Sequence, residues 1–310
     1  NDFAIDFRAV AERRDKVITN TRAFITDLLE HHNIDIFYGE GQILSPGKML
    51  VRKGKLDPDG ETMHYTGEEV ELEAGHIIIS TGSKPLIPGF IDESDPSIVS
   101  SNRLIYIDHL PKELTIVGGG VIGLEFATIF SNLGAKVTIV EFLDRVLAMM
   151  DEDISAEITR ILEQRGIRIL TSYKCLSIEN GLMKAENMKT GKVEEIDAPM
   201  TLVATGRAAV IHEETYDKLG LKYTRKGVEV DDYQRTSVPG IWAVGDATGR
   251  SILAHVGIQQ GIVAAENIMK KEGEPLRKMD YAVIPAVIYT FPEIVGVGIV
   301  PQDLAGVQVV

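Results

Sequence analysis

Residues 114–125 read Leu-Thr-Ile-Val-Gly-Gly-Gly-Val-Ile-Gly-Leu-Glu, and residues 137–141 read Val-Thr-Ile-Val-Glu. The apolar run before Gly118 predicts a strand, and the stretch after it, up to about Leu133, predicts a helix. A second apolar strand follows and ends at the acidic Glu141. Strand, glycine turn, helix, strand and acid in this order are typical of a nucleotide-binding β-α-β unit.

The glycines at positions 118, 120 and 123 have separate tasks in such a unit. Gly118 allows the tight turn from strand to helix, and Gly120 lets the backbone approach a pyrophosphate. Gly123 lets the helix pack closely on the strand. The free N–H groups and the positive dipole end of the helix then face the phosphates. The motif therefore predicts a dinucleotide site at this turn.

Glu141 indicates which dinucleotide is preferred. It lies 21 residues after Gly120, where a carboxylate can accept hydrogen bonds from the adenosine ribose hydroxyls. A 2′-phosphate would meet a negative charge there, so NAD is favoured over NADP. Arg145, four residues further on, leaves that preference open.

Composition narrows the partners and the location. The 310 residues carry 46 acidic and 32 basic side chains, a net charge of −14, which disfavours nucleic acid and membranes as partners. No apolar run is long enough to span a bilayer. Cys175 is the single cysteine, so a reducing, cytoplasmic location is expected. The chain begins at Asn1 without a signal-peptide pattern, and we expect a longer parent chain.

The spacing of apolar residues predicts an α/β fold. Residues 3–31 have the pattern of one long amphipathic helix, and short strands follow up to residues 76–80. Residues 90–102 are rich in Asp, Ser and Pro and are expected to form a linker. From residue 111 to 205, strands and helices alternate before a β excursion and a returning strand. This order predicts a doubly wound parallel sheet.

Three further segments suit a second dinucleotide. Thr81-Gly82-Ser83 closes an apolar strand with small residues, so a flat ligand can approach closely. A second strand, Ile241 to Val244, leads to Asp246, whose carboxylate suits the hydroxyls of a ribose or a polyol. Leu253-Ala254-His255 begins a helix, and the dipole of that helix would stabilise the negative charge of a reduced flavin.

In this order and spacing, these motifs resemble one family. The matching segments are residues 81–85, 118–125, 204–207 and 238–246. They resemble the flavin-dependent pyridine nucleotide–disulfide oxidoreductases, and residues 253–255 and 284–293 resemble the dihydrolipoamide dehydrogenase branch most closely. The resemblance extends over essentially all 310 residues.

The resemblance implies an architecture. It is α/β, with two nucleotide-binding Rossmann-like domains, the NAD domain inserted into the FAD domain, and the start of an α+β interface domain. The implied boundaries are residues 1–110 for the first part of the FAD domain and 111–230 for the NAD domain. Residues 231–278 would complete the FAD domain, and 279–310 would begin the interface domain.

The resemblance also implies the site residues, with FAD and NAD as cofactors. The expected NAD contacts are Gly118, Gly119, Gly120, Val121, Ile122, Gly123, Glu125, Glu141, Cys175, Ala204 and Gly206. The expected FAD contacts are Thr81, Gly82, Ser83, Asp246, Leu253, Ala254 and His255. Cys175 would lie by the adenine, or else fill the core. Glu125 would support the contact between nicotinamide and flavin, or else be a solvated helix residue. No catalytic residue and no metal ligand is expected among these 310 residues.

Departures from the family pattern limit the expected chemistry. Such enzymes begin with a Gly-rich FAD fingerprint and a redox-active Cys-x4-Cys pair, and they end with an acid–base His-Glu pair. We expect these parts to lie outside this sequence. Residues 208–210 read Ala-Ala-Val, where the family has a basic residue, Pro and Asn, which puts the local loop conformation in doubt.

The expected function of the parent protein is electron transfer between a dithiol, dihydrolipoamide, and NAD through FAD. The substrate would be a small molecule or a lipoyl domain. A homodimer is expected because residues 284–300 alternate like an interface sheet. Two alternatives stay open: a soluble pyridine nucleotide transhydrogenase, and a non-catalytic NAD-binding protein.

Overall fold

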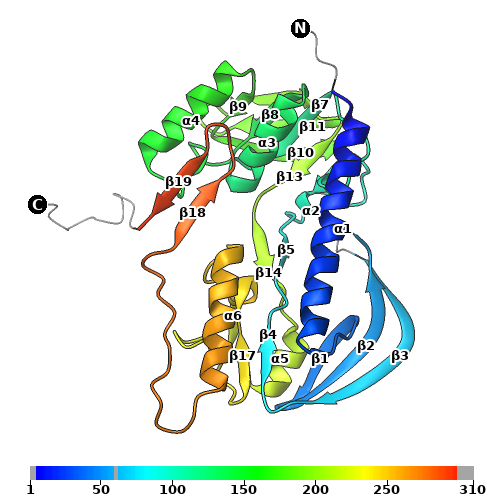
Figure 1. Cartoon of the computed structure of the whole chain (residues 1–310). Coiled ribbons are helices and arrows are strands. Elements are labelled where there is room, and N and C mark those ends of the chain that lie inside the picture. Colours follow the sequence, from blue (N-terminus) through cyan, green and yellow to red (C-terminus); the bar gives the residue numbers. More distant parts are fainter. Residues whose placement is uncertain (1–4, 59–61, 299–310) are drawn as a thin grey trace, which may run out of the picture. The chain divides into compact units, whose positions relative to one another are not determined.

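The computed structural model describes residues 5–58 and 62–298. The chain divides into two compact units (Figure 1). Unit 1 consists of Asn1–Asp35, Pro85–Gly206 and Val287–Val310, and unit 2 of Ile36–Lys84 and Arg207–Ala286. The boundaries expected from the sequence at residues 110, 230 and 278 stay predictions. Residues 299–310 of the expected interface domain lie outside the described residues.

A parallel sheet forms the centre of unit 1. Among the described residues it has five strands in the order β6-β13-β7-β8-β9. The strands are β6 (Ile98–Ser100), β13 (Thr201–Val203), β7 (Glu113–Val117), β8 (Lys136–Val140) and β9 (Arg168–Leu170). The helices α3 (Val121–Asn132) and α4 (Glu152–Gln164) connect β7, β8 and β9. The predicted α/β fold with a parallel Rossmann-type sheet is confirmed, but the sheet is not doubly wound, since an antiparallel meander rather than helices covers one of its faces.

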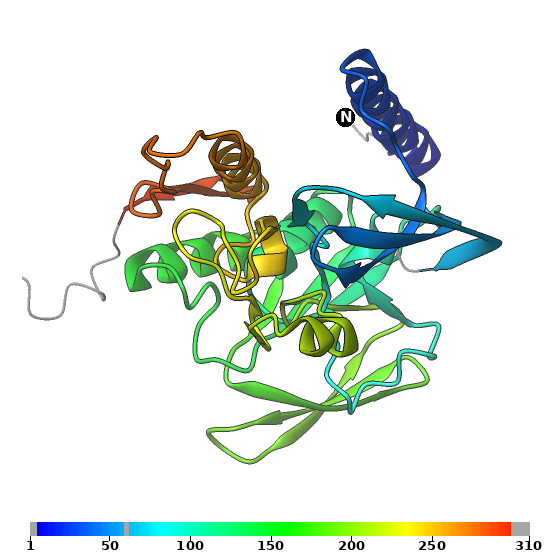
Figure 2. The same cartoon turned by 90° about the horizontal axis from the view of Figure 1, so that it is seen from below.

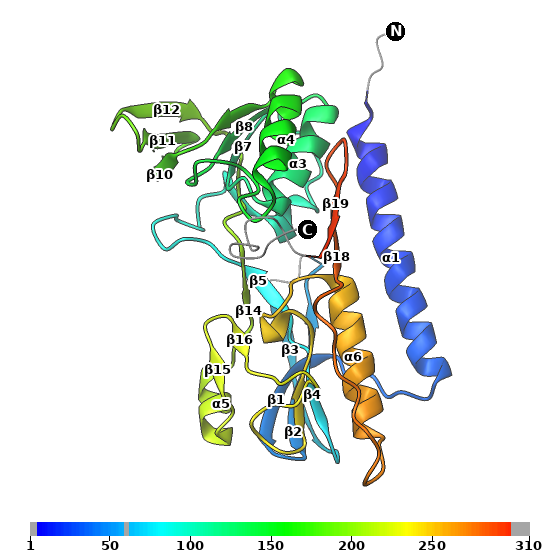
Figure 3. The same cartoon turned by 90° about the vertical axis from the view of Figure 1, so that its left-hand side faces the viewer.

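The two faces of this sheet are covered differently because side chains alternate along each strand. Ile116 and Ile139 pack on the side of α3 and α4 with Leu124. Val117 and Val140 pack on the other side, against an antiparallel meander. The meander consists of β10 (Tyr173–Glu179), β11 (Leu182–Asn187) and β12 (Val193–Asp197). Figure 3 shows these strands and the two helices on opposite sides of the sheet.

The expected linker at residues 90–102 is wrong in part. Its last residues form β6, whose three residues are all buried, and the short helix α2 (Ser101–Leu104) follows at once. The Ser100 side chain caps that helix by accepting a hydrogen bond from the Arg103 N–H. β6 pairs in parallel with β13 and therefore belongs to the core sheet.

The predicted N-terminal helix is confirmed as α1 (Phe7–His31), with Asp6 as its N-cap. Few of its side chains are buried: among its described residues Ala11 alone is buried, and Phe24 is 67% exposed. The hairpin strands β18 (Pro285–Ile288) and β19 (Ile294–Val297) place Ile288 and Ile294 in the core of unit 1.

Unit 2 contains an antiparallel sheet and several short pairs of strands. Figure 2 shows the sheet of β1 (Gly39–Ser45), β2 (Lys48–Leu56) and β3 (Met63–Glu73) as blue and cyan strands. β4 (Ile77–Ile79) pairs with β17 (Ile241–Ala243), β5 (Ser83–Pro85) with β14 (Arg207–Ala209), and β15 (Tyr223–Thr224) with β16 (Gly227–Val228). The helical elements are α5 (Glu213–Leu219), the 3-10 turn η1 (Gly245–Thr248) and α6 (Ala254–Ile268). Ile77, Ile241 and Tyr216 lie in its core.

No helix in the described ranges combines the length and the apolar character needed to cross a membrane.

Candidate functional site

The glycine turn of unit 1 connects β7 to α3. Gly118 has φ +111°, and a Cβ there would collide with the carbonyl group of Ala204. A Cβ at Gly123 would collide with the Gly118 carbonyl oxygen. A Cβ at Gly120 would meet no described atom within 4 Å. The first two glycines are thus required by packing, whereas Gly120 leaves the backbone open to a ligand.

The start of α3 fits a diphosphate. Gly120 is its N-cap and has no side chain to cap the helix, and Val121 and Ile122 occupy the first turn. The N–H groups at the start of a helix have no partner within it, and the helix dipole adds positive potential there. This end of α3 can therefore bind an anionic group through backbone donors.

Glu141 lies at the carboxyl end of β8, and its carboxylate is bound to this turn. One oxygen accepts a hydrogen bond from the Gly119 N–H, and the other accepts one from the Leu143 N–H at 2.7 Å. The residue is only 8% exposed. An ionised carboxylate oxygen accepts more than one hydrogen bond, so Glu141 keeps acceptor capacity for ribose hydroxyls.

Arg145 is engaged within its own loop. Its guanidinium donates to Glu152 at 3.1 Å and to the Ala148 carbonyl oxygen at 3.3 Å. Glu152 stands in the first turn of α4. The Arg145 guanidinium is therefore already bonded to Glu152 and Ala148, whereas binding a 2′-phosphate would need it as a free cation.

Cys175 packs in the apolar core beneath the sheet, where it is 6% exposed. Burial raises the pKa of its thiol to about 11, so the thiol is protonated at neutral pH and is a poor nucleophile. These properties suit a core residue. Contact with adenine stays a prediction.

Glu125 has a partner that the sequence could not indicate. It is half-buried on α3, and its carboxylate accepts a hydrogen bond from the Tyr289 N–H at 3.0 Å. Tyr289 follows β18, and the two residues are 164 positions apart in the sequence. Glu125 thus connects the helix of the glycine turn to the hairpin.

Ala204 and Gly206 follow β13, and Ala204 lies next to the glycine turn. Their contact with the nicotinamide half stays a prediction. The Ala204 carbonyl group packs against Gly118. Gly206 has φ +138°, and its carbonyl oxygen accepts a hydrogen bond from the Leu86 N–H at 3.0 Å. The carboxyl ends of β7, β8 and β13 therefore bring together residues from three parts of the chain.

A polar chain joins the predicted flavin residues of unit 2. The Ser83 hydroxyl donates to the Asp246 carboxylate at 2.5 Å, and Arg207 donates to the Ser83 hydroxyl oxygen at 2.7 Å. Arg207 also donates to the Ser83 carbonyl oxygen at 2.7 Å. Sequence reasoning missed the side-chain role of Arg207, since it considered only the backbone at that position.

The loop left in doubt at residues 208–210 is ordered in the structure. Arg207–Ala209 forms β14, which pairs with β5. The Val210 N–H donates to the Gly82 carbonyl oxygen at 3.0 Å, and the Thr81 hydroxyl donates to the Val210 carbonyl oxygen at 3.1 Å. Gly82 has φ +73°, a conformation that favours glycine. The missing Pro and Asn are therefore not needed for this arrangement.

The third predicted flavin segment begins α6. Leu253 is its N-cap without a side-chain cap, and Ala254 and His255 are exposed in the first turn. The His255 Nε2–H donates to the Pro285 carbonyl oxygen at 2.8 Å. The histidine therefore holds the segment that follows α6.

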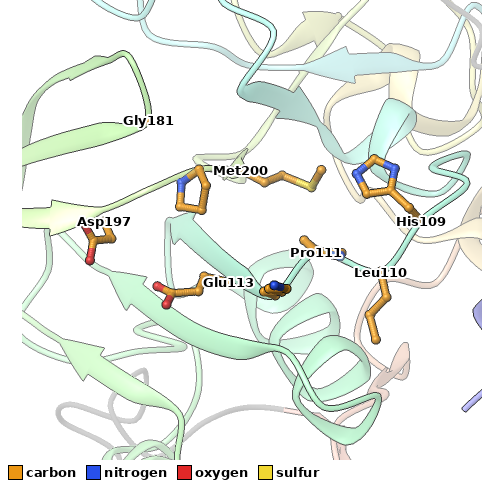
Figure 4. Close-up of a pocket in the computed structure, with 9 residues that line it drawn as sticks. His109, Leu110, Pro111, Glu113, Gly181, Asp197 and Met200 are labelled. Atoms are coloured by element: carbon orange, nitrogen blue, oxygen red, sulfur yellow. The ribbon is translucent and has the colours of Figure 1, made fainter. Parts of the chain in front are cut away.

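Figure 4 shows a hollow of unit 1, about 640 Å³ in volume, whose lining does not include the glycine turn. Its lining includes His109, Glu113 and Met200, at the amino ends of β7 and β13. Ligands of open α/β sheets bind at the carboxyl ends of the strands, so this hollow is not the dinucleotide site. No group of three or more His, Cys, Asp or Glu side chains suited to a metal ion occurs in the described residues.

Comparisons with known proteins agree with this geometry. The family described as "Pyridine nucleotide-disulphide oxidoreductase" matches residues 4–261. The dihydrolipoyl dehydrogenase of Chlamydia pneumoniae is 36% identical over 97% of this chain and 61% of its own length. That of Acholeplasma laidlawii is 33% identical over 87% and 75%. The chain thus spans about three fifths of the length of the first of these relatives.

One solved structure shows the same fold. It is the HOCl-induced flavoprotein disulfide reductase RclA from Escherichia coli, with a TM-score of 0.83 and 24% sequence identity. The match covers 97% of this chain and 66% of that one.

Proposed function

The chain belongs to the pyridine nucleotide-disulphide oxidoreductase family, and on this premise we propose that the protein passes electrons between a dihydrolipoyl group and NAD through FAD. The family uses FAD and NAD(H). When bound, these two cofactors supply the hydride chemistry. The protein has to bind them, orient them and keep them in place.

The observation that carries the proposal is the glycine turn with Glu141 bound to it. Gly120 leaves room for the diphosphate, and the backbone donors at the start of α3 bind it. Glu141 accepts from the adenosine ribose while its bonds to Gly119 and Leu143 fix its orientation. Glu125, already bonded to Tyr289, supports the nicotinamide half.

FAD is assigned to unit 2. Asp246 would accept from the ribityl hydroxyls, with its carboxylate held by the Ser83 hydroxyl, which in turn accepts a hydrogen bond from Arg207. Gly82 approaches the flavin through its backbone, and the first turn of α6, with Ala254 and His255, stabilises negative charge on the ring.

The dithiol step is proposed for the whole protein. The 310 residues contain one cysteine, which is buried and protonated, so the redox pair is not among them. The lipoyl substrate is inferred from the names of the relatives. A cytoplasmic location is proposed because the sequence has one cysteine and therefore no intrachain disulfide.

A homodimer is also proposed. Tyr289, Val295 and Val297 in and beside the hairpin are each about two thirds exposed, as an interface sheet requires before it is covered. Light scattering on the whole protein tests this, and a monomer at micromolar concentration would refute it.

A visible spectrum tests the function. The purified whole protein should be yellow, with a flavin band that NADH bleaches, and it should reduce NAD⁺ with dihydrolipoamide. A yellow protein that reduces NADP⁺ with NADH but ignores dihydrolipoamide would favour the transhydrogenase. A colourless protein that binds NADH would favour the non-catalytic alternative.

The preference for NAD has its own test. Glu141→Gln removes the charge, so NADH binding should weaken about ten-fold, whereas NADPH binding should weaken less or improve. Isothermal titration with both coenzymes measures this. Glu113→Gln, which alters a solvent-facing pair with Lys136 in the same unit, should leave both affinities unchanged.

A further inference from the structure

A buried polar cluster lies behind the Gly245–Asp246 turn of unit 2. Gln260 and Gln234 are both fully buried. The side-chain oxygen of Gln260 accepts a hydrogen bond from the Gly245 N–H at 2.6 Å. The side-chain amides of Gln260 and Gln234 both donate to the Tyr281 hydroxyl oxygen, at 3.0 Å and 3.1 Å.

This cluster acts on a turn that needs support. β17 ends at Ala243, and Gly245, with φ +68°, begins the 3-10 turn that carries Asp246. The Gly245 N–H is bonded to Gln260 on α6. A partly buried N–H that loses such a partner is costly, so Gln260 selects one conformation of this turn.

Tyr281 is itself held in place. The Arg250 guanidinium lies 4.0 Å from the centre of the Tyr281 ring and donates to Asp232 at 3.2 Å. The Asp232 carbonyl oxygen also accepts from the Met279 N–H at 2.8 Å. The segment that carries Tyr281 is therefore tied to unit 2 just before this residue.

Asn267 binds the same segment at Arg277, two residues before Met279. Its side-chain amide donates to the Arg277 carbonyl oxygen at 2.9 Å and accepts from the Arg277 N–H at 2.8 Å. Asn267 is buried on α6, the helix that also carries Gln260. Residues 277–281 thus form a strap that presents the Tyr281 hydroxyl to the two buried amides.

We propose that Tyr281 and Gln260 are positioning residues for the flavin, which fix the Gly245–Asp246 turn so that the Asp246 carboxylate faces the ribityl chain. Ser83 holds that carboxylate directly, and Gln260 holds the backbone that carries it. The inference rests on the proposed assignment of FAD to Asp246. In this proposal Tyr281 acts on the turn through its hydrogen bond with Gln260.

Tyr281→Phe tests the proposal, because it removes the hydroxyl and keeps the ring beside Arg250. Hydrogen–deuterium exchange of the flavin-free protein should show the Gly245 amide exchanging about ten-fold faster. The affinity for FAD, measured by quenching of flavin fluorescence, should fall about ten-fold. The control is Tyr223→Phe, which removes another hydroxyl of unit 2, one that donates to Asp217 at 3.0 Å. It should change neither quantity.

A second variant tests whether Tyr281 acts through Gln260. Gln260→Leu alone should weaken FAD binding at least as much as Tyr281→Phe does. Adding Tyr281→Phe to Gln260→Leu should weaken it less than about two-fold further, because the contact is already lost. Full additivity of the two effects would overturn the proposal, as would wild-type exchange at Gly245 in Tyr281→Phe. A wild-type protein that binds no FAD would refute the proposed function instead, while the flavin-free exchange still decides whether Tyr281 fixes the turn.

Discussion

In the β7–α3 turn, we expect Gly120 to be needed for ligand binding and Gly123 for the stability of the fold. Gly120 has φ −79°, which any residue adopts, and space beside it, so Gly120→Ala should change the free energy of unfolding by less than about 1 kcal/mol. The added methyl group would still block the approach of a diphosphate. We expect NADH affinity to fall at least about ten-fold, as measured by fluorescence titration.

Gly123→Ala, in contrast, should lower the free energy of unfolding. Its Cβ would collide with the Gly118 carbonyl oxygen, so we expect a loss of about 2–4 kcal/mol in urea unfolding. Gly261→Ala on α6 is the matched control, since a Cβ there meets nothing within 4 Å. It should stabilise the protein by about 0.5–1 kcal/mol.

Wild-type NADH affinity in Gly120→Ala would refute a diphosphate at this turn.

Cys175 should make stability depend on alkaline pH. Burial raises the pKa of its thiol from 9.0 to about 11, so folding favours the protonated form. This contribution is complete below pH 9 and is lost as the pH rises through 11. The free energy of unfolding should therefore fall by up to about 3 kcal/mol over this window relative to Cys175→Ala. Chemical denaturation at pH 8, 9, 10 and 11 measures the difference. Parallel curves for the two proteins would contradict a buried thiol.

At the scale of elements, the sequence predicted those helices and strands whose formation depends on residues close together in the chain. The apolar run and the glycines predicted a helix after the glycine motif to about Leu133, and α3 spans Val121–Asn132. β6 was missed because its three residues are all buried, so they show no alternation, and its partner strand β13 lies more than 100 positions away. Sequence patterns report periodicity, whereas such a strand is determined by tertiary pairing.

The same limit applies to the candidate site. Glycines that permit a turn can be recognised locally, because the backbone conformation itself requires them. The bonds of Ser83 to Arg207 and Asp246 span 124 and 163 positions, so no local pattern contains them. The backbone part of a site was therefore predictable, and its side-chain network was not.

Helix α1 provides a prediction at this scale, because few of its side chains are buried. The Arg14 guanidinium donates to the carbonyl oxygens of Ile105 and Ile107, both at 2.8 Å. Arg14→Ala should weaken the attachment of α1 by about 2 kcal/mol. A protease should then cut the chain faster in the segment that follows residue 31. Arg8→Ala, which breaks an exposed pair with Glu12, should have an effect below about 0.5 kcal/mol. Equal cleavage rates for the two variants would show that these carbonyl contacts do not hold α1.

At the scale of the whole molecule, the residues proposed to bind the two coenzymes divide between the two units. The glycine turn, Glu141 and Ala204 belong to unit 1, whereas Ser83, Arg207 and Asp246 belong to unit 2. Each unit has its own buried core. The two ligand sites should therefore be separable by mutation, although each unit is assembled from distant parts of the chain.

Paired variants test this separation. A ligand at 100 times its dissociation constant stabilises the structure that binds it by about 2.7 kcal/mol. In hydrogen exchange, NADH should protect residues 117–124 in wild type and in Asp246→Ala, but not in Gly120→Ala. FAD should protect residues 241–249 in wild type and in Gly120→Ala, but not in Asp246→Ala, because the ribityl acceptor is gone. Loss of both ligands in either variant would mean that the two sites form one cooperative structure, and the assignment of one coenzyme to each unit would then be wrong.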